Sequence, residues 1–249
     1  MNIKPRQKEI LQQLKTNGYA TVKSLIDVLH YSSATINRDL NTLQALGLVK
    51  RTHGGVELTI SQYVPIPFRN HLMRTEKRKI GKLSASFVDN GDVIFIDAST
   101  TAQCMEQFLV GKKDLTVITN NTFLAGNLAG AGIKAVCLGG EIVEPPSMLG
   151  GTDTVLTAMR YKVDKMFFST KAVSQDGFIA SGEVYDVLLK TVAKQSSKVF
   201  YLVDKKKLDK PFNTIYANFE EVDFVISDFE FPITTKDFYK NTKFYTVKD

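Results

Sequence analysis

The spacing of apolar positions predicts three short helices in the first 46 residues of the chain. Apolar side chains recur every three or four positions over residues 5–16, 21–29 and 32–46, which places them on one face of each helix. Pro5 and Thr21 are residues that favour a helix start. A helix, a short helix, a tight turn and a further helix form the order of a helix-turn-helix motif, in which the last helix enters the DNA major groove.

The third of these stretches has defined ends and two different faces. Ser32 or Ser33 can cap its N-terminus, and Gly47 can end it in a left-handed conformation. Its apolar positions are Ile36, Leu40, Leu43 and Leu46, and the opposite face carries Thr35, Asn37, Arg38 and Asn41. Hydrogen-bonding groups and a fixed cation on one face suit the reading of base edges in a major groove. The alternative for this stretch alone is an ordinary surface helix of a small helical bundle.

Two short runs of β-forming residues follow, on either side of Gly54-Gly55. A glycine pair between such runs is a strong hairpin signal. Over residues 48–58 this predicts a wing, which makes residues 1–58 a winged helix-turn-helix domain. Three basic side chains of the hairpin would face DNA phosphates or the minor groove: Lys50, Arg51 and His53.

Beyond a proline-containing linker at residues 59–75, apolar runs typical of buried strands alternate with helical patterns. The predicted strands cover residues 93–96, 115–118, 135–138, 165–168, 199–203 and 224–226, and the predicted helices cover 102–109, 122–129 and 184–194. This order favours a mostly parallel sheet covered by helices on both faces. The chain is therefore expected to be an α/β protein, with a Rossmann-like domain over residues 76–249.

The positive charge of the chain is concentrated in its first third. Of the formal net charge of +6, residues 1–60 hold eight Lys and Arg against four Asp and Glu, residues 61–82 hold six against one, and the remainder holds 18 against 21. A basic module on a slightly acidic body suggests binding to a polyanion. The cations of residues 69–82 either contact DNA or an anionic ligand, or belong to a solvated helix that joins the two domains, which is the simpler interpretation.

Composition excludes several classes of protein. No run approaches the roughly 18 apolar residues of a membrane span, and the start of the chain lacks the apolar core of a signal peptide. Cys104 and Cys137 lie within apolar patterns and are expected to be reduced, buried thiols of a cytoplasmic protein, with a disulfide as the alternative. No metal-ligand spacing is present, and neither a metal nor a cofactor is expected.

The motifs of the first domain resemble those of the DeoR family of bacterial transcriptional regulators. The resemblance rests on Ser33-x-Thr35-Ile36-x-Arg38-Asp39-Leu40, followed by Leu43, Gly47, Arg51 and His53-Gly54-Gly55. It covers the N-terminal domain closely and the rest of the chain more loosely. The family usually has two basic residues before the Asp, whereas the first of them here is Asn37, so one DNA contact is expected to differ.

Three polar loops are expected at one edge of the predicted sheet. Each follows the carboxyl end of a strand, which is where ligands of open α/β sheets bind. The loops are Asp97-Ala98-Ser99-Thr100-Thr101, Thr119-Asn120-Asn121 and Gly139-Gly140-Glu141. Hydroxyls and backbone N–H groups at a helix start suit a phosphate, and glycines let a ligand approach the backbone. Helix capping, an Asx turn and a tight turn are the respective alternatives.

The family resemblance implies an effector domain that is similar in fold to ribose-5-phosphate isomerase and senses phosphorylated sugars or related metabolites. Ser99-Thr100-Thr101 occupies the place of the family's phosphate loop, with Ser99 where glycine is commonest. The candidate effector contacts are Asp97, Ser99, Thr100, Thr101, Asn120, Gly139, Gly140, Lys171, Glu183 and Lys190. For Lys171 the alternative is a plain surface lysine, and for Lys190 it is a helical ion pair with Asp186.

The expected function is that of a sequence-specific DNA-binding regulator, a repressor of sugar-metabolism genes controlled by a phosphorylated sugar. The candidate DNA contacts are Ser32, Ser33, Thr35, Asn37, Arg38, Asn41, Lys50, Arg51 and His53. Operator DNA, the phosphorylated sugar and further copies of the chain in a homodimer or homotetramer are the expected partners.

The alternative is a sugar-phosphate isomerase that carries a DNA-binding appendage. Aldose–ketose isomerisation needs a placed base and an electrophile near the carbonyl. The isomerase family's Asp-Gly-Ala-Asp and Lys-Gly-Gly stretches have no counterpart around Ser169-Thr170-Lys171-Ala172, so no enzyme activity is expected.

Overall fold

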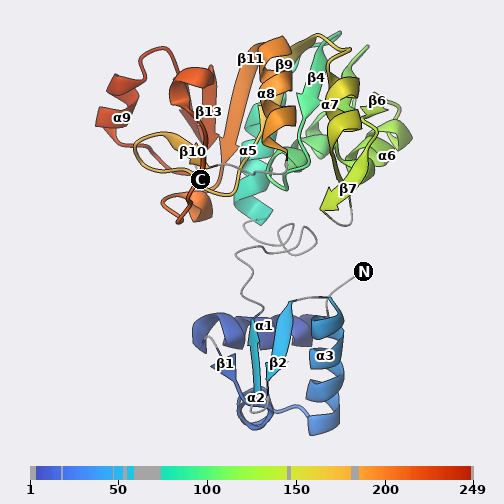
Figure 1. The fold of residues 1–249 in the computed structure, drawn as a ribbon, viewed down its shortest axis with the longest axis vertical. Coiled ribbons are helices and arrows are strands. Elements are labelled where there is room, and N and C mark those ends of the chain that lie inside the picture. Colours follow the sequence, from blue (N-terminus) through green and yellow to red (C-terminus); the bar gives the residue numbers. More distant parts are fainter. Residues whose placement is uncertain are drawn as a thin grey trace. The chain divides into compact units, whose positions relative to one another are not determined.

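The computed structural model describes residues 4–17, 19–46, 48–52, 55–58, 74–144, 147–180 and 185–247 of the chain. The chain divides into two compact units, Met1–Pro65 and Ile66–Asp249, and each is described by itself (Figure 1). The division falls within the stretch expected to be a linker, residues 59–75.

The first unit, as far as it is described, combines helices with a small antiparallel sheet. Its elements are α1 (Pro5–Asn17), β1 (Tyr19–Ala20), α2 (Val22–Leu29), α3 (Ser33–Ala45), β2 (Val49–Thr52) and β3 (Gly55–Leu58). The strand order is β1-β3-β2, and β2 with β3 forms the predicted wing. The sequence pattern does not predict β1, because a strand of two residues is too short to show an alternation.

Local signals start the helices of this unit. Thr21 Oγ1 accepts a hydrogen bond from the Ser24 amide (2.9 Å), and Ser32 Oγ accepts one from the Thr35 amide (3.2 Å). Each hydroxyl satisfies a helix donor that would otherwise be unpaired. Of the two candidate caps for α3, the structure uses Ser32. Gly47, the predicted end of α3, lies outside the described residues.

The apolar face of α3 is buried against the other helices. Ile36, Leu40 and Leu43 are completely buried, together with Ile10 and Leu14 of α1. Burying one such side chain contributes about 1.5–3 kcal/mol relative to leaving it exposed. Leu46 is only half-buried, because α3 ends one residue before it. The core therefore holds α3 with its polar face towards solvent.

The second unit is built on a sheet in which seven parallel strands are described. Their order is β14-β13-β11-β9-β4-β5-β6. The strands are β4 (Val93–Ile96), β5 (Thr116–Thr119), β6 (Lys134–Cys137), β9 (Val163–Phe168), β11 (Ser196–Val203), β13 (Phe224–Ser227) and β14 (Lys243–Thr246). All but β14 match predicted strands. The β14 run, Lys-Phe-Tyr-Thr, carries too few apolar residues to signal a buried strand, and it lies at the edge of the sheet.

Helices and 3₁₀ turns connect these strands. They are α5 (Arg74–Ser86), η1 (Ala102–Phe108), α6 (Thr122–Gly130), α7 (Thr152–Ala158), α8 (Asp186–Gln195), η2 (Lys205–Lys207), η3 (Phe219–Glu221) and α9 (Ile233–Phe238). The predicted α-helix at 102–109 is a 3₁₀ helix. Two antiparallel strand pairs lie outside the large sheet: β7 (Glu141–Glu144) with β8 (Met148–Gly150), and β10 (Phe178–Ala180) with β12 (Ile215–Asn218).

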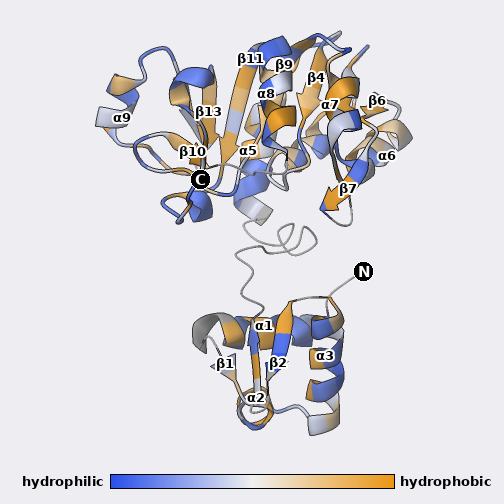
Figure 2. Cartoon of the chain, in the orientation of Figure 1, coloured by the Kyte–Doolittle hydropathy of each residue, from blue (hydrophilic) through white to orange (hydrophobic). Residues whose placement is uncertain are grey.

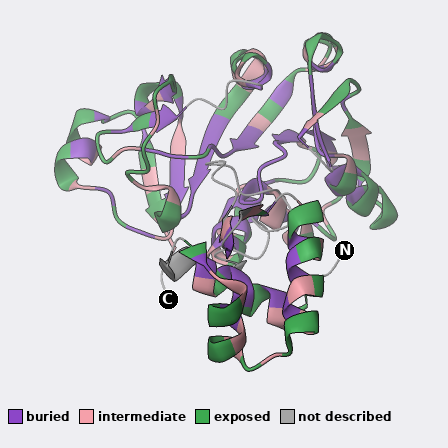
Figure 3. Ribbon diagram, turned by 60° about the horizontal axis from the view of Figure 1, so that its bottom comes forward, coloured by how far each residue is buried: buried purple, intermediate pink, exposed green. Residues whose placement is uncertain are grey.

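Neighbouring residues along a strand pack into different cores, one on each face of the sheet. Phe167 and Phe200 lie in a buried cluster with side chains of α5, η1 and α6, whereas Phe168 and Tyr201 lie in a second cluster with side chains of α7 and α8. Figure 2 shows the apolar character of these strands, and Figure 3 shows how far they are buried. The sheet is thus covered on both faces, as predicted. Within the described part, no helix is both long and apolar enough to cross a membrane.

Candidate functional site

The polar face of α3 is presented to solvent, as the pattern predicts. Arg38 and Asn41 are exposed, and Thr35 and Asn37 are half-buried. Ser32 Oγ and Thr35 Oγ1 lie 2.8 Å apart and share a hydrogen bond at the start of the helix. This end of α3 is therefore ordered by its own hydroxyls.

Arg51 of the wing reaches onto the polar face of α3. Its Nη1 donates to Asn41 Oδ1 (2.8 Å), and its Nη2 donates to Asn37 Oδ1 (2.5 Å). Asn37 Nδ2 in turn donates to the carbonyl oxygen and the hydroxyl oxygen of Ser33 (2.9 and 3.3 Å). Four candidate DNA contacts are thus joined by hydrogen bonds, a link that the sequence pattern does not reveal.

Lys50 and His53, the other basic candidates of the wing, are placed differently. Lys50 is exposed and pairs with Glu57 in the β2–β3 register. His53 lies outside the described residues.

Asp39 supports α3 from inside the unit. Its carboxylate is buried and accepts hydrogen bonds from Arg6 Nε and from Gln7 Nε2 (2.9 Å), both on α1. Burial raises the pKa of Asp39, but the hydrogen bonds from Arg6 and Gln7 outweigh it and hold the pKa below its usual value. Asp39 therefore anchors α3 to α1, and the motif that contains it is partly structural.

The order of the strands creates a switch point in the large sheet of the second unit. From β4 the chain continues through β5 and β6 on one side, and then returns to β9 on the other side of β4 and continues to β11, β13 and β14. Crevices at such reversals, beyond the carboxyl ends of the strands, are where open α/β sheets bind ligands. The loops after β4, β9 and β11 meet at this edge.

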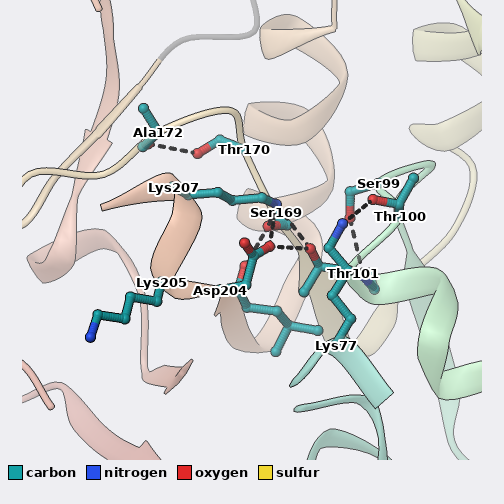
Figure 4. A network of polar contacts seen from close by, with 12 residues as sticks. Lys77, Ser99, Thr100, Thr101, Ser169, Thr170, Ala172, Asp204, Lys205 and Lys207 are labelled. Atoms are coloured by element: carbon teal, nitrogen blue, oxygen red, sulfur yellow. Dashed lines mark hydrogen bonds and ion pairs between the residues drawn. The ribbon is translucent and has the colours of Figure 1, made fainter. Parts of the chain in front are cut away.

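Two lysines and several hydroxyls gather at the switch point (Figure 4). Lys77 Nζ of α5 donates to Thr100 Oγ1 (2.9 Å), and Lys207 Nζ of η2 donates to Thr101 Oγ1 (2.9 Å) and Ser169 Oγ (2.6 Å). The Asp204 carboxylate lies 3.8 Å from Lys207 Nζ and 3.4 Å from Thr101 Oγ1. We refer to Lys77, Thr100, Thr101, Ser169, Asp204 and Lys207 as the lysine-hydroxyl cluster.

The sequence pattern predicts the threonines of this cluster but not its lysines as site residues. Lys77 belongs to the basic stretch for which a solvated helix is the simpler interpretation, and at this position that interpretation is wrong, because Lys77 is only 3% exposed. Lys207 follows Asp204 at a spacing that resembles a pattern of the DeoR family, but this spacing does not predict that Lys207 lies beside the threonines. The sequence signal that could identify Lys77 is its spacing of three and seven residues from Ile80 and Ser84, which puts it on the same face of α5 as these two buried residues.

Ser99 differs from the two threonines that follow it. Its Oγ donates to Asp97 Oδ1 (2.5 Å) and accepts from the Ala102 amide at the start of η1 (3.2 Å). Ser99 therefore has the helix-capping role that was the alternative for this loop, whereas the hydroxyls of Thr100 and Thr101 accept hydrogen bonds from the lysines.

Asp97 is buried at the same edge of the sheet. Its Oδ1 accepts the Ser99 hydroxyl, but its Oδ2 has no hydrogen-bond partner among the described residues. Burial raises the pKa of Asp97 to about 6, although hydrogen bonds from Ser99 and the charge of Lys207 act in the other direction. Near neutral pH this carboxylate is therefore held ionised at a cost in stability.

We expect Asp97→Asn to remove part of the pH dependence of stability. The folded state of the native protein binds the Asp97 proton more tightly than the unfolded chain, so its free energy of unfolding falls as the pH rises from about 4 to about 6. The pKa difference corresponds to about 3 kcal/mol for this group. Urea unfolding at pH 4.5 and pH 7 should show a flatter profile for Asp97→Asn, with the exposed Asp237→Asn as control. If the free energy of unfolding changes equally with pH in the native protein and in Asp97→Asn, then Asp97 is not the source of this pH dependence.

Asn120 joins the candidate loops to each other. Its Oδ1 accepts from the Ala98 amide (3.0 Å), and its Nδ2 donates to the Leu149 carbonyl oxygen (2.9 Å). Asn121 Oδ1 accepts from the Phe123 and Leu124 amides and so caps α6. These contacts favour a positioning role for Asn120, because both ends of its amide already bind the protein.

The two glycines after β6 have different surroundings. Gly140 has φ +120°, and a Cβ there would lie 2.0 Å from Thr154 Oγ1 and 2.6 Å from the Gly150 carbonyl oxygen. Close packing against Thr154 and Gly150 therefore explains why a glycine is needed at position 140. A Cβ on Gly139 would meet nothing within 4 Å, so only Gly139 fits the expected open approach to the backbone.

The remaining candidates have different surroundings. Lys171 is exposed. Burial raises the pKa of the Glu144 carboxyl to about 7, and the positive charge of Lys171 acts to lower that pKa. Lys190 is exposed and lies over the Tyr216 ring, 5.6 Å from its centroid. Glu183 lies outside the described residues.

The chemistry of the lysine-hydroxyl cluster suits an anion. Ammonium groups act as point charges for phosphate, and the hydroxyls can donate to phosphate oxygens. In the described part of the chain, no group of three or more His, Cys, Asp or Glu is placed to hold a metal ion.

Both units match known sequence families. A profile described as the DeoR-like helix-turn-helix domain matches residues 6–62, and one described as the DeoR C terminal sensor domain matches residues 73–229.

Curated relatives align with most of the chain. The HTH-type transcriptional repressor GlcR of Bacillus subtilis (strain 168) is 32% identical over 222 residues, 88% of this chain and 86% of that protein. The lactose phosphotransferase system repressor of Lactococcus lactis subsp. lactis is 35% identical over 221 residues, 84% of this chain and 85% of that protein. The glycerol-3-phosphate regulon repressor of Escherichia coli (strain K12) is 26% identical over 232 residues, 92% of each.

Similarities to solved structures are more distant. Ribose 5-phosphate isomerase from Plasmodium falciparum gives a TM-score of 0.41 at 17% identity and covers 55% of this chain and 53% of that chain. eIF2B delta from Chaetomium thermophilum gives a TM-score of 0.47 at 15% identity and covers 81% and 66%. Likeness at this level implies no shared activity.

Proposed function

Because the chain belongs to the DeoR family of transcriptional regulators, we propose that it represses sugar-metabolism genes and that a phosphorylated sugar controls its binding to operator DNA. The protein is a DNA-binding regulator and not an enzyme, since its aligned relatives are named repressors. The observation that carries the effector part of the proposal is the lysine-hydroxyl cluster at the switch point of the sheet.

The proposed effector site uses the cluster for the phosphate group. Lys77 and Lys207 supply positive charge, and Thr100, Thr101 and Ser169 already lie within hydrogen-bond distance of those lysines. A phosphate oxygen that replaces a hydroxyl as the acceptor of a lysine N–H would bring opposite charges into contact, and the hydroxyls can then donate to phosphate oxygens. Lys171 and the buried carboxyl of Asp97 are proposed to face the sugar part of the ligand.

Operator binding is proposed to use the exposed face of α3 together with the wing. Two of the relatives are named for a lactose phosphotransferase system and a glycerol-3-phosphate regulon, which supports a role in the metabolism of sugars and related compounds. We also propose that the protein binds DNA as a homodimer or homotetramer, because paired half-sites raise affinity and fix the register on the duplex.

A thermal-shift screen of the full chain tests the effector proposal. The compounds are hexose 6-phosphates, hexose 1-phosphates, pentose 5-phosphates and glycerol 3-phosphate, with the unphosphorylated sugars and inorganic phosphate as matched controls. A ligand at 100 times its dissociation constant should add about 2.7 kcal/mol to the free energy of unfolding. A shift with a phosphorylated compound and none with its unphosphorylated form is expected.

The same compound must also act on DNA binding. An effector shifts an equilibrium only if it binds the DNA-bound and free conformations with different affinity. We expect it to weaken operator binding by about 5- to 150-fold, the usual range of allosteric coupling. No response to any phosphorylated compound, or a thermal shift without a change in DNA affinity, would contradict the proposal.

A further inference from the structure

The contact between the wing and α3 assigns Arg51 a different role from the one its sequence position predicts. A basic residue on a wing strand is expected to face phosphates or the minor groove. Instead, the Arg51 guanidinium lies on the polar face of α3, bound to the amide oxygens of Asn37 and Asn41. These two asparagines are four residues apart and so lie on the same side of the helix.

The partners of Arg51 orient it without cancelling its charge. Both are neutral carbonyl oxygens of side-chain amides. A guanidinium has five N–H donors, and these two hydrogen bonds use two of them. Among the described residues, the other three donors have no hydrogen-bond partner, and the positive charge stays with a side chain that is held by two asparagines.

Asn37 is committed to holding this arrangement. Its Oδ1 accepts from Arg51, and its Nδ2 donates to the carbonyl and hydroxyl oxygens of Ser33. Base reading by Asn37 would have to break these bonds, so Asn37 acts as a positioning residue. Asn41 is exposed and uses its Oδ1 for Arg51, and its Nδ2 has no hydrogen-bond partner among the described residues.

Charge explains why the arrangement depends on an uncharged residue at position 37. A cation there would repel the guanidinium and could not accept its hydrogen bond. With asparagine at this position, the wing arginine can approach α3 and supply the positive charge that the helix itself lacks there.

We propose that Arg51 is a base-reading residue of the DNA interface, delivered from the wing to the recognition surface by Asn37 and Asn41. It would act beside Arg38, and its ligand is the major-groove edge of a base pair, with guanine as the base that arginine reads in bidentate fashion. The inference rests on DNA binding by the first unit and is independent of the identity of the effector.

Selection from a random double-stranded DNA library, with the full chain and its variants, tests this proposal. The native protein should select a consensus. Arg51→Ala should lose the preference at one base pair of each half-site and bind the consensus roughly 5- to 150-fold more weakly, as expected for loss of one bidentate pair. Arg51→Lys should not restore the preference, because a lysine lacks the planar fork. Asn37→Ala should weaken the same preference and add nothing in combination with Arg51→Ala.

Two control variants separate base reading from phosphate contact. Arg38→Ala should relax the preference at a different base pair. Lys50→Ala should weaken binding to all DNA sequences equally and should reduce the slope of log affinity against log salt concentration by about 1. Uniform weakening by Arg51→Ala with an unchanged consensus, rescued by Arg51→Lys, would make Arg51 a phosphate contact and overturn the proposal. Thermal melting of each variant reports whether it folds. Failure of the native protein to select any consensus would refute sequence-specific binding itself, whereas failure of the effector screen would leave this inference standing.

Discussion

Replacing Lys77 by methionine is expected to lower the affinity for a phosphorylated effector by about 10- to 150-fold, the usual contribution of a hydrogen bond to a charged group. Lys77 is buried at the switch point, and its Nζ binds the Thr100 hydroxyl. Methionine has a similar length and volume, so the buried space stays filled while the charge is lost. Calorimetric titration with the compound found in the thermal-shift screen measures the change.

The matched control for this prediction is Lys82→Met, on the same helix. Lys82 is exposed, so its loss removes the same net charge without touching the lysine-hydroxyl cluster. Lys82→Met should bind the effector as the native protein does. If Lys77→Met also binds with native affinity while remaining folded, then the cluster is not the phosphate site.

Replacing Phe200 by alanine should destabilise the second unit by about 3–5 kcal/mol. Phe200 lies in the middle of the sheet and stacks against Phe224 and Phe167, with ring centroids 4.3 and 4.6 Å away. Truncation would leave a cavity in one of the two cores, next to the strands that lead into the candidate loops. Urea unfolding followed by circular dichroism measures the loss.

Phe123→Ala is the control for the cavity prediction. Phe123 lies on α6 and is 53% exposed, so its truncation should change stability by less than about 0.5 kcal/mol. If Phe200→Ala and Phe123→Ala lower the free energy of unfolding equally, then burial of Phe200 in this core does not determine the stability of the unit.

The winged helix is the part that local sequence patterns predict best. The period of Ile36, Leu40 and Leu43, the Ser32 cap and the glycine pair of the wing each depend on neighbouring residues, and the structure has the corresponding helix, cap and hairpin. The family resemblance, which rests on the same residues, is confirmed by the match to both family profiles.

The second unit is predicted in outline, but its candidate site is predicted only in part. Apolar strand runs were sufficient for a parallel sheet, and the loop with Thr100 and Thr101 does lie at its carboxyl edge. For the basic run that contains Lys77, the sequence favours a solvated helix, because a run of cations without a visible partner is usually exposed. Its hydroxyl partner lies 23 residues away, and Lys207 meets Thr101 across 106 residues.

Helix periods, caps and turn residues act between close neighbours, and so they were enough to predict the class of fold and the DNA-binding class of the protein. Which charged side chains share a site depends on strand order and on which loops meet at one edge of the sheet, and these are long-range properties. Only the folded chain brings Lys77 to Thr100 and Lys207 to Thr101 and Ser169. Only the folded chain brings the Arg51 side chain from the wing onto the polar face of α3. Hydrogen bonds between distant residues leave no periodic pattern in the sequence. For this physical reason, the contacts within the proposed DNA-reading surface and the candidate effector site can be identified only from the folded structure.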